Sequence, residues 1–118
     1  VYQAGTLSAN PVAMAAGLAT LRQLTDGTAY LALEDSGRML EELLRDVPGV
    51  QLRRVGSLFW LVLDGAAESR FPKFFHARLA EGIYLPPSPW EVGFLPTAHT
   101  DEDLHALATA ITEKVPDP

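Results

Sequence analysis

The residues that decide the fold lie in the middle of the chain, at positions 50–63. They read Val50-Gln51-Leu52-Arg53-Arg54-Val55-Gly56-Ser57-Leu58-Phe59-Trp60-Leu61-Val62-Leu63. The first part alternates apolar and polar residues, and the second is a near-continuous run of aliphatic and aromatic residues. Both patterns are typical of β-strands, and the glycine between them predicts a tight turn or a bulge. We therefore expect two strands, over 50–55 and 57–63.

The residues before this stretch have a helical pattern. Asn10 is a suitable N-cap and Pro11 fits the first helical position, so a helix is expected to begin there and to end near Gly27. A second helix is expected from Thr28 to about Arg45, with leucines on one face and charged residues, including Glu34 and Glu41, facing water. Gly37 in its middle indicates either a weaker helix or a close contact.

The residues after the strands predict four further elements: a helix over 71–80, short strands over 83–85 and 91–95, and a helix that a capping box at Thr100 opens and that ends near 113. Pro72 is placed in the first turn of the third helix and Gly82 after its end. The order predicts an α+β fold, with a small mixed or antiparallel sheet and helices packed on one side. We divide the chain into 1–27, a loop and leading helix, and 28–118, the sheet domain.

Composition limits the classes of protein to which the chain belongs. Its 118 residues are 47% hydrophobic and 20% charged, which favours one folded domain. The net charge of −6 argues against binding to nucleic acid or to an anionic membrane surface, and no apolar run is long enough to span a bilayer. Without cysteine, and with three scattered histidines, the chain predicts no metal site. It begins at Val1, without an initiator methionine or signal pattern, which predicts a piece of a longer chain.

Two loops are candidates for chemistry. Residues 5–10, Gly-Thr-Leu-Ser-Ala-Asn, lead into a helix and offer free amides and hydroxyls to a phosphate, although their spacing alone favours an ordinary capped helix start. Glu91 follows a proline-rich loop and is suited to binding an ammonium group or moving a proton, whereas the plainer interpretation is a solvated glutamate. The aromatic residues are expected to lie in the core: Phe59, Trp60, Phe71, Phe74 and Phe75.

Two segments resemble the glutamate-1-semialdehyde 2,1-aminomutases, which belong to the class-III aminotransferase family of pyridoxal-phosphate enzymes of fold type I. Residues 1–17 resemble the family's segment after the lysine-bearing region. Residues 82–94, followed by Ala98-His99-Thr100, resemble its C-terminal signature. The resemblance covers essentially the whole chain and implies the C-terminal portion of such an enzyme, with the C-terminal small domain of fold type I.

The resemblance also implies roles for individual residues. Gly5 and Thr6 match a Gly-Thr pair that reaches across a dimer interface to the cofactor phosphate, with a backbone amide and a hydroxyl. Glu91 matches the glutamate on the substrate side of the site and is the catalytic candidate, while Ser88 helps to fix its loop. Ala9 departs from the glycine that is usual there, which restricts the loop if a positive φ is required.

The activity that the resemblance implies moves an amino group within glutamate 1-semialdehyde to give 5-aminolevulinate, the tetrapyrrole precursor. The cofactor is pyridoxal or pyridoxamine 5′-phosphate, the enzyme a cytoplasmic homodimer, and the partner of this portion the large catalytic domain. Lys73 and Lys114, the two lysines, match no catalytic position, so the 118 residues alone are expected to be inactive. The alternatives are the C-terminal domain of another class-III aminotransferase, or a non-catalytic binding or oligomerisation module.

Overall fold

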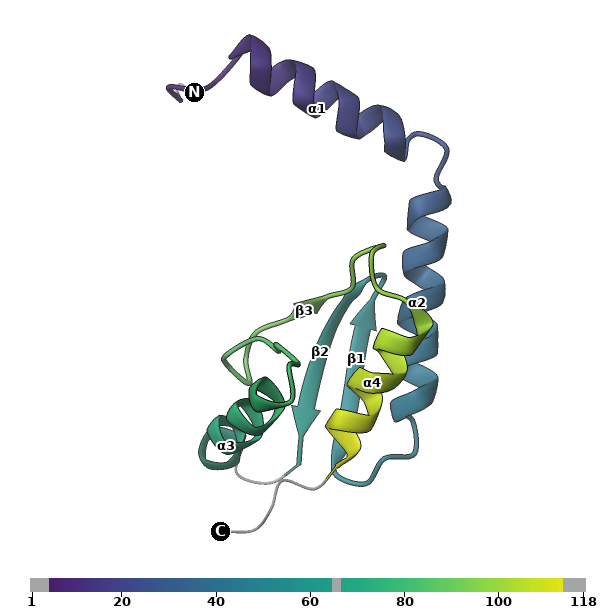
Figure 1. The fold of residues 1–118 in the computed structure, drawn as a ribbon, viewed down its shortest axis with the longest axis vertical. Coiled ribbons are helices and arrows are strands. Elements are labelled where there is room, and N and C mark those ends of the chain that lie inside the picture. The colour runs from purple at the N-terminus through teal and green to yellow at the C-terminus, as the bar shows by residue number, and fades with distance from the viewer. Residues whose placement is uncertain (1–4, 65–66, 114–118) are drawn as a thin grey trace.

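A computed structural model describes residues 5–64 and 67–113 of the chain. Four helices and three strands follow one another in the order α-α-β-β-α-β-α (Figure 1). Their bounds are α1 Pro11–Leu24, α2 Thr28–Leu44, β1 Val50–Val55, β2 Leu58–Leu63, α3 Ala67–Ala80, β3 Gly93–Phe94 and α4 Asp101–Thr112.

The strands form one antiparallel sheet in the order β1-β2-β3. Val50 pairs with Leu63 and Val55 with Leu58, so Gly56, at φ 58°, and Ser57 form a two-residue turn between β1 and β2. On the far side of β2, Phe59 pairs with Gly93 of β3. This confirms the α+β prediction and selects the antiparallel form of the sheet.

The core lies between one face of the sheet and the helices α2, α3 and α4. Because side chains alternate along a strand, Phe59 and Leu61 of β2 face the same way and both are buried. The core consists of Leu40, Leu44, Phe59, Leu61, Phe71, Phe74, Leu85, Leu95, Leu104, Ala108 and Ile111. Its members come from three helices, the sheet and the segments that flank β3, and burial of their apolar surface is the main force holding these elements together.

The helix ends agree with the expectations drawn from capping residues. The Oδ1 of Asn10 accepts hydrogen bonds from the amides of Val12, at 3.0 Å, and Ala13, at 3.3 Å. At α4, the Thr100 hydroxyl accepts from the Asp103 amide at 3.2 Å, while the Asp103 carboxylate accepts from the Thr100 amide at 2.8 Å. This is the expected capping box, with aspartate at its third position.

The segment after α3 differs from its prediction. Residues 83–85 form no strand, and the strand expected over 91–95 is reduced to Gly93–Phe94. The Ile83 amide donates instead to the Arg78 carbonyl at 2.9 Å, which closes the end of α3, and the prolines that follow have no N–H for a sheet. Helix α3 also begins at Ala67 rather than near 71, so Pro72 lies inside the helix and not in its first turn.

Helix α1 projects away from the sheet domain. It has no buried residue, and Figure 1 shows it leading away from the end of α2 at an angle. The radius of gyration is 18.0 Å, against about 13–14 Å expected for a compact chain of this length. The loop 5–9 before α1 therefore lies well outside the sheet domain.

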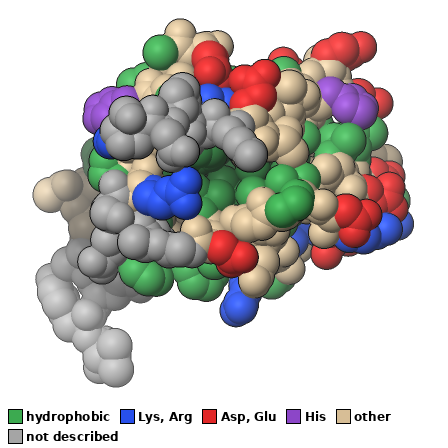
Figure 2. All heavy atoms as spheres, turned by 90° about the horizontal axis from the view of Figure 1, so that it is seen from below, with side chains coloured by type: hydrophobic (Ala, Val, Ile, Leu, Met, Phe, Trp, Pro, Cys, Tyr) green, Lys and Arg blue, Asp and Glu red, His purple; other side chains and the backbone are tan. Residues whose placement is uncertain are grey.

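Charged groups are mixed on the surface that Figure 2 shows. Basic side chains lie there singly among acidic and apolar ones and form no continuous basic patch on that face (Figure 2). Among the described residues, no helix is both long enough and apolar enough to cross a membrane. In the same part of the chain, no three histidine or acidic side chains come together as a metal site would require.

Candidate functional site

The loop that carries Glu91 is a tight hydrogen-bonded turn. The Glu91 amide donates to the Ser88 carbonyl at 3.2 Å, which closes a four-residue turn over Ser88-Pro89-Trp90-Glu91. Proline suits the second position of such a turn because its ring fixes φ. The Ser88 hydroxyl accepts from the Trp90 amide at 3.2 Å, so the serine side chain braces the same turn. The Ser88 side chain is thus part of the hydrogen bonding of this turn.

A tryptophan of the sheet holds this turn from the side. The indole Nε1 of Trp60 in β2 donates to the Pro89 carbonyl at 2.7 Å. The rings of Trp60 and Trp90 lie 6.4 Å apart between centroids, tilted by 44°. Arg53, the cross-strand partner of Trp60, places its guanidinium 5.8 Å from the centre of the Trp60 ring. The Glu91 turn is therefore attached to the middle of the sheet.

Trp60 does not belong to the core, contrary to the expectation. Strand alternation turns it to the sheet face opposite Phe59 and Leu61, and it is only partly buried. The prediction was correct for Phe59, Phe71 and Phe74, which are buried, and Phe75 packs against the core. The alternation of side chains along strand 58–63 could have placed Trp60 on the face opposite Phe59 and Leu61. The near-continuous apolar run made both faces of the strand look equally suited to the core.

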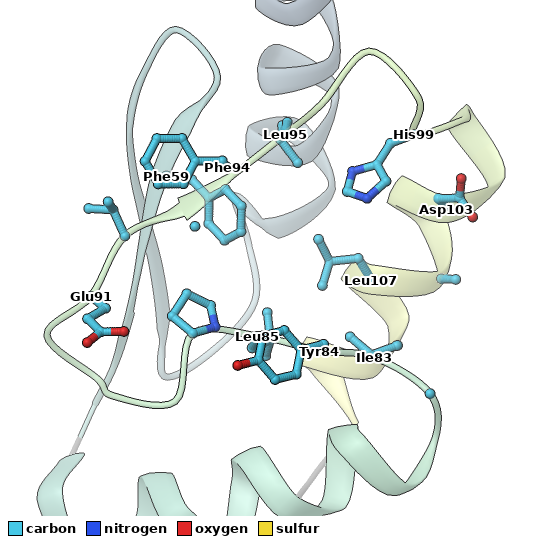
Figure 3. Close-up of a pocket in the computed structure, with 15 residues that line it drawn as sticks. Phe59, Ile83, Tyr84, Leu85, Glu91, Phe94, Leu95, His99, Asp103 and Leu107 are labelled. Atoms are coloured by element: carbon cyan, nitrogen blue, oxygen red, sulfur yellow. The ribbon is translucent and has the colours of Figure 1, made fainter. Parts of the chain in front are cut away.

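A cavity of about 530 Å³ opens beside the Glu91 turn. Figure 3 shows Glu91 at one end and His99 with Asp103 at the other, with apolar side chains such as Tyr84, Phe94 and Leu107 between them. An apolar hollow with a few polar groups at its ends is the usual form of a small-molecule site. Glu91 is exposed at its mouth, and its carboxylate accepts no hydrogen bond from another described residue.

The acidic group at the opposite end of the cavity already has partners. Hydrogen bonds from the Thr100 backbone and hydroxyl, reinforced by the nearby His99, hold the pKa of Asp103 below its ordinary value. Asp103 is therefore ionised and engaged in the helix cap. Of the two carboxylates that line the cavity, Glu91 is the one available to a ligand.

The second candidate, the loop 5–10, is a compact turn in front of α1. The Ser8 amide donates to the Gly5 carbonyl at 3.0 Å and the Asn10 amide to the Leu7 carbonyl at 3.1 Å. Thr6 is exposed, and its amide and hydroxyl form no hydrogen bond with other described residues. Ala9 has φ 59°, the left-handed conformation that favours glycine. The loop thus has the positive φ at which alanine is less favourable than the glycine that is usual at this position.

The structure does not bring the two candidate loops together within one chain. Residues 5–9 lie beyond the far end of α1, whose 14 residues correspond to about 21 Å of helix. The segment between α3 and β3, which carries Glu91, lies beside the sheet, whereas α1 leads away from the sheet domain (Figure 1). Thr6 and Glu91 of one chain are thus separate features.

Comparisons with known proteins give the affiliation. No protein-family model matches the chain. Over 94% of its length it is 43% identical to a glutamate-1-semialdehyde 2,1-aminomutase of Akkermansia muciniphila, of which it covers 30%. Aminomutases of two Anaeromyxobacter strains, Fw109-5 and dehalogenans 2CP-1, are 46% and 47% identical over 96% and 93% of the chain. The chain is similar in sequence to the C-terminal part of the glutamate-1-semialdehyde 2,1-aminomutases.

The chain spans less than a third of the length of these curated aminomutases and matches their C-terminal part. Solved structures agree with this placement. A transaminase with pyridoxal phosphate bound matches with a TM-score of 0.78 at 27% identity, over 95% of the chain and 28% of that protein. An omega-transaminase from Sphaerobacter thermophilus matches with a TM-score of 0.76 at 30% identity, over 95% of the chain and 29% of that protein.

Proposed function

We propose that the chain is the C-terminal part of an enzyme that converts glutamate 1-semialdehyde to 5-aminolevulinate with pyridoxal phosphate. The observation that carries this proposal is the 43–47% identity to aminomutases across more than nine-tenths of the chain. We assign residues 28–118 to its small domain and residues 1–27 to a cofactor-contact loop and leading helix. The absence of any α1 residue from the described core supports this division.

Glu91 is assigned to the substrate. Its exposed carboxylate stands at the mouth of the apolar cavity on a turn that Ser88 braces. The substrate and product both carry an amino group, and an ionised carboxylate at this place binds an ammonium or accepts a proton from it. Ser88 acts through the turn and not on the substrate.

Gly5 and Thr6 are assigned to the cofactor phosphate. The loop presents the Thr6 amide and hydroxyl to solvent, and both donate to phosphate oxygens. A Cβ at Gly5 would come within 2.9 Å of the Ser8 Oγ, a contact that rotation of the exposed serine side chain can relieve. The first basic residue of the chain is Arg22, so the loop supplies neutral donors only. Most of the compensating positive charge must come from other parts of the enzyme.

The separation of Thr6 from Glu91 suits a homodimer in which the loop of one subunit completes the cofactor site of the other. The bound cofactor supplies the electron sink for exchange of the amino group. Its lysine is assigned to the larger part of the enzyme, since Lys73 on α3 is not among the residues that line the cavity beside Glu91, and Lys114 lies outside the described residues. The 118 residues alone are therefore inactive. We also assign the whole enzyme to the cytoplasm.

The test is an assay of the full-length protein with pyridoxamine phosphate and glutamate 1-semialdehyde, beside the same assay of the 118-residue chain. The full-length protein is expected to form 5-aminolevulinate without an added amino donor or acceptor, and the short chain is expected to form none. Another class-III aminotransferase would require a separate donor and acceptor, which is the result that would replace this proposal with the alternative.

A further inference from the structure

Glu91 lies on a turn that is attached to the sheet by a residue outside the turn. The bonds inside the turn, from Trp90 and Glu91 to Ser88, give it a shape but do not fix its position over the cavity. On one side the chain runs through the proline-rich segment 86–89, and on the other β3 contains only Gly93 and Phe94. Another group must determine the position of the turn.

Trp60 is the group that reaches it. Its Nε1 donates to the Pro89 carbonyl at 2.7 Å, at the short end of the usual range for N–H···O hydrogen bonds. Pro89 is the second residue of the turn. The partners are 29 positions apart in sequence, so the bond joins the turn to the central strand of the sheet. The Trp90 ring adds a second contact, at 6.4 Å between ring centroids.

Trp60 is itself held in place. It occupies the central strand, between β1 and β3, and its cross-strand partner Arg53 lies 5.8 Å from its ring centre. A guanidinium at this distance attracts the face of an indole ring. The Arg53 contact thus helps to orient the indole whose N–H donates to the Pro89 carbonyl.

Resting on the proposed function, we propose that Trp60 is a positioning residue for Glu91, which sets the place of the carboxylate at the mouth of the cavity through the Pro89 carbonyl and the Trp90 ring. It touches neither substrate nor cofactor. A carboxylate displaced by about 1 Å loses much of its advantage in binding and proton transfer, so the attachment determines how well Glu91 works.

The structural half of the proposal is tested in the 118-residue chain by amide hydrogen exchange. Trp60→Phe keeps an aromatic ring but removes the five-membered ring that carries the N–H, and it is expected to speed exchange at Trp90 and Glu91 by roughly three- to tenfold, the loss of one hydrogen bond. Exchange in α4 should not change. Val62→Ala, on the same strand and the same face, is the control and should leave the turn protected. Unchanged exchange at Trp90 and Glu91 in Trp60→Phe would overturn the proposal.

The functional half is tested by a double-mutant cycle in the full-length enzyme. Trp60→Phe is expected to lower kcat/KM for glutamate 1-semialdehyde roughly three- to tenfold with the cofactor absorption spectrum unchanged. In a Glu91→Gln background it should have no further effect, because it acts through Glu91. Additive effects would overturn the positioning role while leaving the proposed function intact. A Glu91→Gln enzyme with unchanged kinetics would instead overturn the substrate role of Glu91, and the positioning role with it.

Discussion

Gly37, in the middle of α2, lies directly against the carbonyl of Gly56 in the β1–β2 turn. A Cβ at position 37 would come within 2.7 Å of that oxygen and within 2.8 Å of the Arg54 Cδ. The close approach lets Arg54, whose side chain is 11% exposed, lie across the helix and bind Glu34 at 3.0 Å and Glu41 at 3.2 Å. Glu34, Gly37 and Glu41 follow a helical spacing that places them on one face of α2. The missing side chain at 37 thus makes room for a cation between two carboxylates.

Gly37→Ala is expected to destabilise the 118-residue chain. The added methyl group meets backbone as well as the arginine stem, and overpacking of this kind costs about 1–3 kcal/mol in free energy of unfolding. Urea unfolding followed by circular dichroism measures it. Gly17→Ala on α1 is the matched control, because a Cβ there meets nothing within 4 Å, and its stability should be unchanged or slightly higher. Equal stability of the two variants would mean that the contact at Gly37 is not present in solution.

The ion pair between Glu34 and Arg54 predicts a dependence of stability on pH. The hydrogen bond and charge of Arg54, with help from Arg38, hold the pKa of Glu34 below its ordinary value. A carboxyl group whose folded pKa is depressed contributes its full stability above the ordinary pKa, about 4.3, and loses it as pH falls through the folded value. The free energy of unfolding should therefore decline below about pH 4.3.

Glu34→Gln should make this decline shallower, and urea unfolding between pH 3 and 7 measures the difference. Asp35→Asn serves as control, since among the described residues Asp35 pairs with Arg38 alone, on its own helix, and is 73% exposed. Its profile should run parallel to that of the unmodified chain. A Glu34→Gln profile with an undiminished slope would show that other carboxyl groups account for the acid dependence.

The left-handed conformation of Ala9 predicts an effect on cofactor retention in the full-length enzyme. Non-glycine residues adopt this conformation at a cost of about 1–2 kcal/mol, and a β-branched residue is less tolerant still. Ala9→Val should therefore weaken binding of pyridoxal phosphate by roughly 1 kcal/mol, whereas Ala9→Gly should bind at least as tightly as the unmodified enzyme. Dialysis against cofactor-free buffer, followed by absorption, measures both. Tighter retention in Ala9→Val than in Ala9→Gly would contradict the loop conformation.

Local signals predicted most of the fold. Asn10 and Thr100 cap their helices because capping depends on residues within one turn, and the alternation and turn glycine of 50–63 predicted the β1–β2 pair. The strand expected over 83–85 was wrong because the Ile83 amide closes α3; Gly82 at the helix end was the local signal for this closure. Glu34 and Glu41 were expected to face only water, and their bonds to Arg54 depend on a strand 13–20 residues away.

The site was predicted less completely than the fold. Glu91 was a candidate from its proline-rich loop, the resemblance gave it and Ser88 their roles, and the structure adds the turn that joins them. The contact of Trp60 with Pro89 was missed because it links positions far apart in sequence and because Trp60 stands in an apolar run that favours a core assignment. The separation of Thr6 from Glu91 could not be predicted from sequence patterns either, because it depends on the angle between α1 and α2.

The most direct test of the account is steady-state kinetics of the full-length enzyme with Glu91→Gln. Glutamine keeps the size of the side chain and removes its charge, so the turn and the fold should be unchanged. We expect kcat/KM for glutamate 1-semialdehyde to fall by at least tenfold, corresponding to about 1.4 kcal/mol or more of lost stabilisation, with cofactor content unchanged. A kcat and a KM both equal to those of the unmodified enzyme would contradict the central claim that Glu91 faces the substrate.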